Sequence, residues 1–117
     1  MLVNILKAKI HRAQVTQADM NYMGSITIDR ALCEGVGILN YEKVSIYNIT
    51  NSERFSTYVI YGEEGKVCLN GAAARRVAVG DVIIVAAYCQ MEEKEARVHK
   101  PKIVVLNENN KPLQAGG

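Results

Sequence analysis

Basic and hydroxyl-bearing residues recur on short segments whose alternation predicts β-strands. Lys9 and His11 share one face of such a segment, and Arg54 and Tyr58, four residues apart, share a face of another. An arginine can bind a carboxylate through two parallel hydrogen bonds, and a tyrosine hydroxyl can donate a proton. Each of these residues taken alone is typical of an exposed strand. Together they are compatible with an anionic ligand, bound either by an enzyme or by a non-catalytic module.

The residue patterns of the common catalytic and cofactor sites are absent from the sequence. His11 and His99 are the only histidines, and with the three cysteines they show no spacing typical of zinc. No GxxxxGK[ST], GxGxxG or GxSxG motif occurs. The acidic residues Glu92, Glu93 and Glu95 alternate with basic ones and predict a solvated helical face. We therefore expect no metal site and no pyridoxal phosphate site.

Length, composition and charge indicate one small globular domain, residues 1–117. Apolar residues make up 49% of the chain and charged residues 22%, which is ordinary globular usage. A net charge of +2 is less basic than a dedicated nucleic-acid binder. Three widely spaced cysteines indicate reduced thiols, and the longest apolar run is too short to cross a bilayer. We expect a cytoplasmic protein that binds neither membrane nor nucleic acid.

Strands account for most of the predicted elements. Period-two alternation and β-branched or aromatic residues predict strands over 6–11, 25–29, 44–49, 54–61, 66–69 and 82–88. The last of these segments is continuously apolar, which is typical of a strand buried on both faces. A small protein built from such strands must protect their edges, and closure into a barrel does so. The sequence therefore favours a mainly β barrel with short helices.

The predicted helices are few and short. Asp29 can cap a helix over 30–34 that ends at a following glycine. A helical turn is predicted over 71–76 and a third helix over 13–21. The polar stretch 107–117 is predicted to fray.

Four short motifs occur in an order and at spacings that are typical of one enzyme family. They are Lys9-Ile10-His11-Arg12, Tyr22-Met23-Gly24-Ser25, Arg54-Phe55-Ser56-Thr57-Tyr58 and Asn70-Gly71-Ala72-Ala73-Ala74. With them the chain resembles the pyruvoyl-dependent aspartate 1-decarboxylases over most of its length. The resemblance implies a double-psi β-barrel that forms a homotetramer with active sites between subunits. It also implies conversion of L-aspartate to β-alanine and CO₂ through a Schiff base, for pantothenate and coenzyme A biosynthesis.

The resemblance further implies that the chain cuts itself between Gly24 and Ser25. The Ser25 hydroxyl would attack the Gly24 carbonyl, and elimination and hydrolysis would leave a covalent pyruvoyl group as the cofactor, without a metal. The products would be a β chain, residues 1–24, and an α chain, residues 25–117. Glycine before the serine lets the hydroxyl approach the carbonyl and tolerates strained backbone angles. Some members of the family need a helper protein for this maturation.

Roles for further residues follow from the same resemblance. Ser25 becomes the pyruvoyl group that binds substrate, and Tyr58 returns a proton to the substrate carbon. The residues implied in substrate binding are Lys9, Arg54, Thr57, Gly71, Ala72 and Ala73. Those implied in self-processing and its support are Gly24, Tyr22, His11, Thr57 and Asn70. Because Thr57 and Tyr58 are adjacent, a regular strand points them to opposite faces. A bulge, a strand end or two subunits would be needed to bring both to one site.

Two alternatives to the active enzyme stay open from the sequence. A small basic β-barrel could bind an anion or nucleic acid without catalysis, through Lys7, Lys9, Arg12 and Arg54. A family member that never matures would carry every motif residue and remain uncut. Cleavage of the purified chain would separate the enzyme from both.

Overall fold

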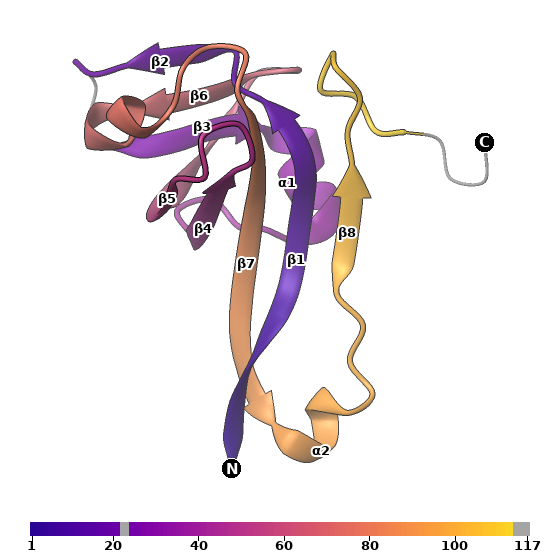
Figure 1. The fold of residues 1–117 in the computed structure, drawn as a ribbon. Helices are drawn as coiled ribbons and strands as arrows, with labels where there is room; N and C mark the ends of the chain where they lie inside the picture. The colour runs from indigo at the N-terminus through magenta and orange to yellow at the C-terminus, as the bar shows by residue number, and fades with distance from the viewer. Residues whose placement is uncertain (22–23, 114–117) are drawn as a thin grey trace.

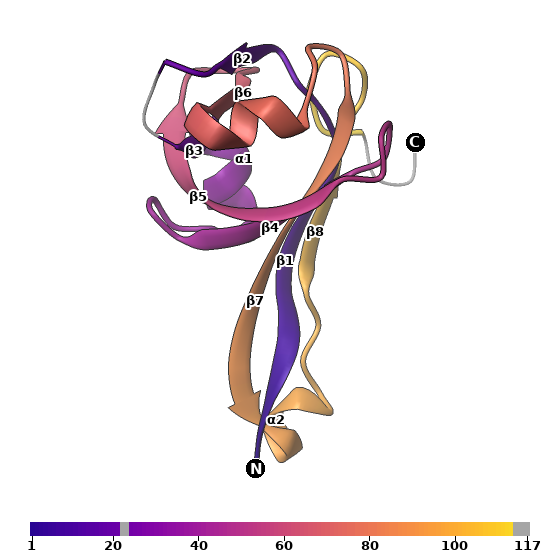
Figure 2. The same ribbon diagram turned by 60° about the vertical axis from the view of Figure 1, so that its left-hand side comes forward.

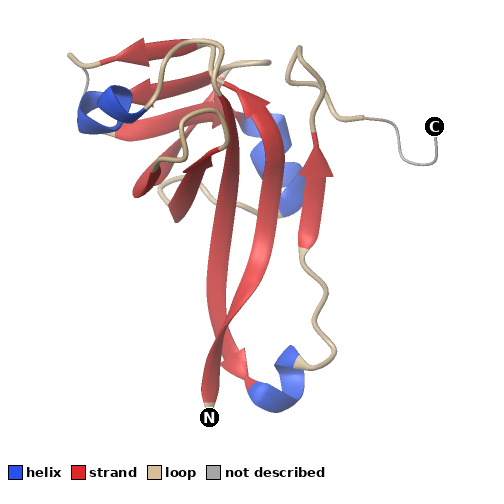
Figure 3. Cartoon of the chain, in the orientation of Figure 1, coloured by secondary structure: helices blue, strands red, loops and turns tan. Residues whose placement is uncertain are grey.

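Strands dominate the structure (Figure 3). The computed structural model describes residues 1–21 and 24–113. Its strands are β1 (Leu2–Gln14), β2 (Gln17–Asp19), β3 (Ser25–Asp29), β4 (Lys43–Asn48), β5 (Arg54–Gly62), β6 (Val67–Asn70), β7 (Val82–Glu92) and β8 (Lys102–Val105). Its helices are α1 (Arg30–Val36), the 3-10 helix η1 (Gly71–Arg76) and α2 (Glu93–Ala96). The predicted mainly β fold with short helices is confirmed.

The strands form one eight-stranded sheet that closes on itself. Its order is β2-β6-β3-β5-β4-β7-β1-β8. β1 pairs with β7, and β2 pairs with β6. Since β1 and β2 are successive parts of the chain, they connect the β7 side of the sheet to its β6 side. Backbone hydrogen bonds of 2.8 Å, from Thr16 N to Val67 O and from Gly80 N to Val15 O, hold this junction. The closed sheet agrees with the expected barrel, and its double-psi connectivity stays a prediction.

β1 and β7 pair along their whole length and extend as a ribbon away from β2–β6, with α2 at its tip (Figures 1 and 2). The register of β1 shifts at Lys7 and again at Arg12, whose φ is 67°. Each shift reverses the alternation of side chains. As a result Ala13 is buried on the same side as Ile10, and Lys9 and His11 lie on the opposite face.

Alternation along the strands separates an apolar interior from a more polar outer face. The interior is filled by fully buried side chains, among them Ile10, Ile26, Ile28, Ile46, Val59, Leu69, Ile83 and Val85. On β7, Val82 and Ile84 are only partly buried, and Tyr88 is exposed. The prediction that this strand is buried on both faces is therefore wrong for most of its outer face, because only the inner face packs on the core.

Two of the three predicted helices form where the sequence places them. The Asp29 carboxylate accepts a hydrogen bond from Ala31 N at 2.9 Å, and Gly37 ends α1 with a φ of 81°. The predicted turn over 71–76 is η1. The helix predicted over 13–21 is wrong, because these residues end β1 and form β2, and pairing with β6 outweighs their weak helical tendency. None of the described helices is long and apolar enough to cross a membrane.

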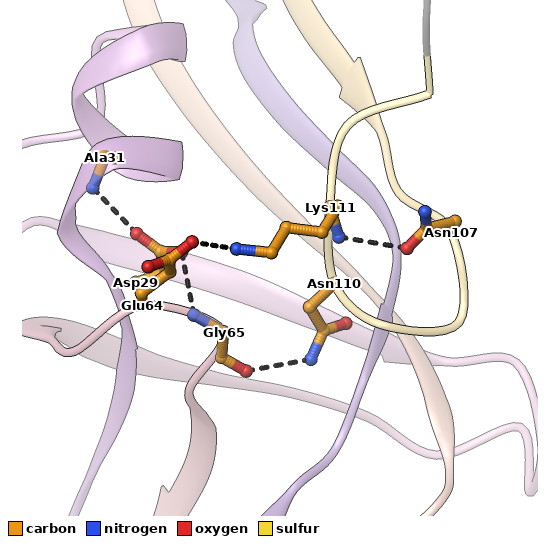
Figure 4. Close-up of polar contacts among 7 residues, drawn as sticks. All are labelled: Asp29, Ala31, Glu64, Gly65, Asn107, Asn110 and Lys111. Carbon is orange, nitrogen blue, oxygen red and sulfur yellow. Dashed lines mark hydrogen bonds and ion pairs between the residues drawn. The ribbon is translucent and has the colours of Figure 1, made fainter.

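The C-terminal residues 107–113 are tied to the body of the protein. The buried Asn110 side chain donates to Gln14 O at 2.9 Å and to Gly65 O at 3.1 Å, and it accepts from Gln14 N at 2.7 Å. Figure 4 shows the contact with Gly65. The predicted fraying is therefore wrong for 107–113, because one side chain satisfies backbone groups of two other segments. Residues 114–117 lie outside the described part of the chain.

Candidate active site

β3 begins at the residue predicted to be the nucleophile. Ser25 is 4% exposed and lies opposite Asn70 on the antiparallel neighbour β6. On its other side β3 pairs with β5 in parallel, from Ile26 and Val59 onward. The Gly24–Ser25 peptide bond thus lies beside Asn70, where the β3–β6 pair begins.

The Asn70 carboxamide holds the Ser25 side chain in place. Its Nδ2 donates to Ser25 Oγ at 2.9 Å and to Thr27 Oγ1 at 3.0 Å. Its Oδ1 accepts from the Cys68 thiol, whose Sγ lies 3.1 Å away. All four side chains belong to one face of the β3–β6 pair, since Ser25 faces Asn70 and Thr27 faces Cys68 across the ladder. A donor on the serine oxygen stabilises the charge that the oxygen gains when it acts as a nucleophile.

A cleft of about 410 Å³ opens beside this peptide bond. It is lined by Gly24, Phe55, Ser56, Thr57, Tyr58, Ala72, Ala73 and Arg76. The structure therefore brings five predicted site residues to one place, and two more, Ser25 and Asn70, lie directly beside it. Hollows of about 420 and 580 Å³ beside α1 hold none of the predicted residues that the structure describes.

Thr57 and Tyr58 both line the cleft although they alternate along β5. Thr57 is partly buried and Tyr58 is 36% exposed, as expected for opposite faces. β3 pairs with β5 only from Val59 onward, so this edge of β5 before Val59 has no partner in β3. At such an edge, residues of either face can border the same cleft. The two residues lie inside β5 and pair with β4, so the structure shows an edge without a partner in β3 and not the strand end considered from the sequence.

The predicted basic residues lie on a different surface. Lys9 and His11 are on the outer face of β1, which is separated from β5 by β7 and β4. Three strand spacings amount to about 14 Å across the sheet. Arg54, at the start of β5, lines a separate hollow with Tyr47 and Glu53. None of the three basic residues lines the cleft beside Gly24.

His11 lies in a cationic and partly dry environment. Its Nδ1 is buried and has no hydrogen-bond partner among the residues that the structure describes. Burial, and then the charges of Lys9 and Arg12, lower the pKa of His11. The neutral imidazole is therefore favoured at neutral pH.

Arg54 packs on Tyr47, which in turn contacts Tyr88, and neither tyrosine has a role predicted from the sequence. The guanidinium carbon lies 4.5 Å from the centre of the Tyr47 ring. The Tyr47 hydroxyl lies 2.7 Å from the Tyr88 hydroxyl on β7. The hydrogen bond from Tyr88, helped by Arg54, lowers the pKa of Tyr47. Alternation places Tyr47 on the outer face, but its pairing with Arg54 depends on the register of β4 with β5.

The predicted glycines differ in what the fold requires of them. Gly71 begins η1 with a φ of 61°, which favours glycine. At Gly24, a Cβ atom would meet nothing nearer than Asn70 O, at 3.9 Å. The described structure thus gives no steric reason for glycine at position 24. Tyr22 lies outside the described residues.

Arg76 received no predicted role, but it lines the cleft. Its guanidinium pairs with the Glu53 carboxylate at 2.6 Å.

The three cysteines are free thiols. Within residues 1–21 and 24–113, no three His, Cys, Asp or Glu side chains gather in a way that could hold a metal ion. The sequence could have indicated that Cys68 contacts Asn70, because the two residues are two apart on a strand and therefore share a face.

Comparison with known proteins gives a consistent result over almost the whole chain. A family model described as aspartate decarboxylase matches residues 1–113. A protein named aspartate 1-decarboxylase from Clostridium kluyveri is 55% identical over 97% of this chain and 91% of its own length. Proteins of the same name from Caldicellulosiruptor saccharolyticus and Campylobacter hominis are 58% and 53% identical, over 95% and 97% of this chain and 88% and 100% of their own lengths.

Proposed function

The chain belongs to the aspartate decarboxylase family, and we propose that it works through a pyruvoyl group made by self-cleavage between Gly24 and Ser25. It is a carbon–carbon lyase that converts L-aspartate to β-alanine and CO₂, and its product serves pantothenate biosynthesis. The observation that carries the proposal is the position of the Gly24–Ser25 bond, beside Asn70 and at the wall of a cleft that Thr57 and Tyr58 also line.

Self-cleavage begins when Ser25 Oγ attacks the Gly24 carbonyl carbon. The peptide C–N bond breaks as the ester forms, and the serine nitrogen takes up a proton. Loss of the Ser25 Cα proton then expels the Gly24 carboxylate and leaves dehydroalanine, which reacts with water to give the pyruvoyl group and ammonia. The fragments are residues 1–24 and 25–117.

Two side chains support this attack in our proposal. Asn70 Nδ2 donates to Ser25 Oγ, which stabilises charge on the attacking oxygen. Thr57 lines the same cleft as Gly24, where its hydroxyl can donate to the carbonyl oxygen as that atom gains charge. Both side chains come from the chain that is cut.

The pyruvoyl group supplies an electrophilic carbonyl that accepts the electrons released when CO₂ leaves the substrate. Tyr58 lines the cleft and is partly exposed, so its hydroxyl can return a proton to the substrate carbon. Ala72 and Ala73 border the cleft with small side chains, which leaves their backbone accessible to the substrate.

The positive charges that suit a dianionic substrate come from a second subunit in our proposal. Lys9, His11 and Arg54 lie on the outer sheet face and not at the cleft of their own chain. A neighbour that presents this face to the cleft brings them to the substrate, where the Arg54 fork can bind a carboxylate. The distance of these residues from the cleft of their own chain supports active sites at subunit interfaces, and we propose the homotetramer typical of the family.

Mass spectrometry of the intact preparation tests the proposed cleavage. We expect two masses, for residues 1–24 and 25–117, with the larger fragment blocked to N-terminal sequencing because a carbonyl replaces its amine. Ser25→Ala should fold, stay uncut and form no β-alanine from aspartate. An uncut, unmodified chain that still releases CO₂, or an active Ser25→Ala variant, contradicts the proposal.

The requirement for a helper protein is tested in the same assay. Cleavage that starts only when cell extract is added indicates a helper. A chain that stays uncut with and without extract, even after prolonged warming, favours an immature family member or a non-catalytic anion-binding module.

The free thiols support a cytoplasmic setting for the reaction.

A further inference from the structure

We propose that Cys68 is a positioning residue for self-cleavage, which fixes the Asn70 carboxamide so that its amide nitrogen, and not its oxygen, faces Ser25. The inference rests on the proposed function, because it concerns the cleavage at Ser25. It adds to that function a residue that acts through Asn70 and touches neither the substrate nor the bond that breaks.

The two ends of the Asn70 carboxamide meet different partners. Nδ2 faces two hydroxyls, those of Ser25 and Thr27. Oδ1 faces the Cys68 thiol. Hydroxyls can donate as well as accept, so Ser25 and Thr27 would tolerate a carboxamide turned by 180°. The turned carboxamide would place two N–H donors against a sulfur that accepts only weakly. The thiol is therefore the partner that selects the orientation.

The surroundings of Cys68 keep its thiol a donor. The residue is 3% exposed, and this burial raises the pKa of its thiol, so the sulfur retains its proton at neutral pH. The other acceptor near Sγ is Leu69 O at 3.9 Å, which is a much longer contact than the 3.1 Å to Asn70 Oδ1. The S–H bond is thus directed at Asn70.

The orientation of the carboxamide decides how readily Ser25 can attack. When Nδ2 donates to Oγ, the serine proton is left for another acceptor, and the donor stabilises the oxygen as it gains charge. With Oδ1 in that place, the hydroxyl would donate to Asn70, and loss of its proton would cost that hydrogen bond. The lone pairs of Oδ1 would also repel the charged oxygen. Cleavage should therefore slow when the thiol is removed.

Two substitutions separate positioning from packing. Cys68→Ser keeps a donor in a smaller side chain, and Cys68→Val fills a similar volume without a donor. A packing role ranks Val above Ser, because burying an extra hydroxyl is unfavourable. A positioning role ranks Ser above Val. We expect the cleavage rate of freshly synthesised chain to stay within about threefold of wild type for Cys68→Ser and to fall about tenfold for Cys68→Val.

The control is Cys33→Val, which replaces a fully buried thiol on α1 and should cleave at the wild-type rate. Fragments 1–24 and 25–117 are quantified over time by mass spectrometry, and a cooperative thermal transition verifies folding. Should Cys68→Val fail to fold, Cys68→Ala takes its place in the same comparison.

Wild-type cleavage by Cys68→Val, or equal slowing by both Cys68 substitutions, overturns the positioning role and leaves the proposed function intact. A wild-type chain that stays uncut with and without cell extract overturns the proposed function, and the positioning role with it. The rescue by serine is the outcome that a structural role alone does not produce.

Discussion

The predicted site residues differ in burial and hydrogen bonding between the cleft and the outer sheet face. At the cleft, Ser25 and Asn70 are buried and joined through a hydrogen-bonded carboxamide. On the outer face, Lys9, His11 and Arg54 are partly or fully exposed. Burial of unpaired cations is costly, whereas a neutral hydrogen-bonded group can be buried at little cost. In our proposal the residues for cutting the peptide are therefore buried and hydrogen-bonded, and the charges for an anionic substrate stay on the surface.

This difference makes the two reactions separable by substitution. Changes to the hydrogen-bonded group around Ser25 should alter self-cleavage, because Asn70 donates to the proposed nucleophile. Changes to the outer face should alter turnover of aspartate and leave cleavage unaffected, because that face acts after the subunits have met.

Tyr58→Phe should have the largest effect on turnover. We expect kcat for β-alanine formation to fall about 10²–10⁴-fold, since the proton donor is lost, while fragments 1–24 and 25–117 form as in wild type. Tyr41→Phe, at an exposed loop tyrosine, is the matched control and should retain full activity. A wild-type kcat for Tyr58→Phe would mean that another group donates the proton. Loss of cleavage would instead place Tyr58 with the maturation machinery.

Arg54→Lys should have the next largest effect. Lysine keeps the charge and loses the planar fork, so we expect kcat/KM for aspartate to fall about 10- to 100-fold. Self-cleavage should proceed at the wild-type rate, as the comparison of the two regions requires. The control is Arg75→Lys, an exposed position outside the cleft. Slower cleavage in Arg54→Lys, with kcat/KM unchanged, would reverse the assignment of the outer face.

The sequence predicted the strands and the start of α1 better than it predicted the contacts between them. Alternation and turn residues located most strands, and Asp29 marked the start of α1. The cleft shared by Thr57 and Gly24 depends on the pairing of β3 with β5, two strands that are separate in the chain. Likewise, nothing near Tyr47 in the sequence points to Tyr88, because their contact requires β4 and β7 to pair. Such long-range registers are set by tertiary packing, which local patterns do not encode.

The errors have the same origin. The helix expected over 13–21 failed because this segment links the two sides of the closed sheet, where pairing with β6 outweighs local propensity. The fraying expected over 107–113 failed because Asn110 bonds backbone groups of distant segments. In both cases the local sequence does not show the distant segment with which these residues form hydrogen bonds.

Tyr88→Phe should have a smaller effect, confined to substrate binding. Loss of the hydroxyl removes the hydrogen bond that fixes Tyr47 and loosens the ring beneath Arg54. We expect KM for aspartate to rise about two- to fivefold, with kcat and cleavage unchanged. Tyr61→Phe is the control, because it removes a hydroxyl that donates to Ile38 O at 2.7 Å, away from both regions. An equal change of KM in both variants would indicate a general loosening of the fold.

The smallest expected effect is on stability and concerns His11. Because the pKa of folded His11 lies below its ordinary value near 6.5, the unfolded chain binds this proton more readily. The free energy of unfolding should therefore rise with pH up to about 6.5 and then stop changing through this group, with a slope below about 1.4 kcal/mol per pH unit. His11→Gln should lose that part of the slope.

Urea denaturation of both chains from about pH 5 to about pH 8, at one fixed protein concentration, measures this difference. The two chains share every other titratable group, so the change in slope isolates His11. A steeper slope in His11→Gln, or none lost, would mean that the imidazole is paired in the folded protein. The outer face would then be hydrogen-bonded at His11, and the contrast between the two regions would disappear at that residue.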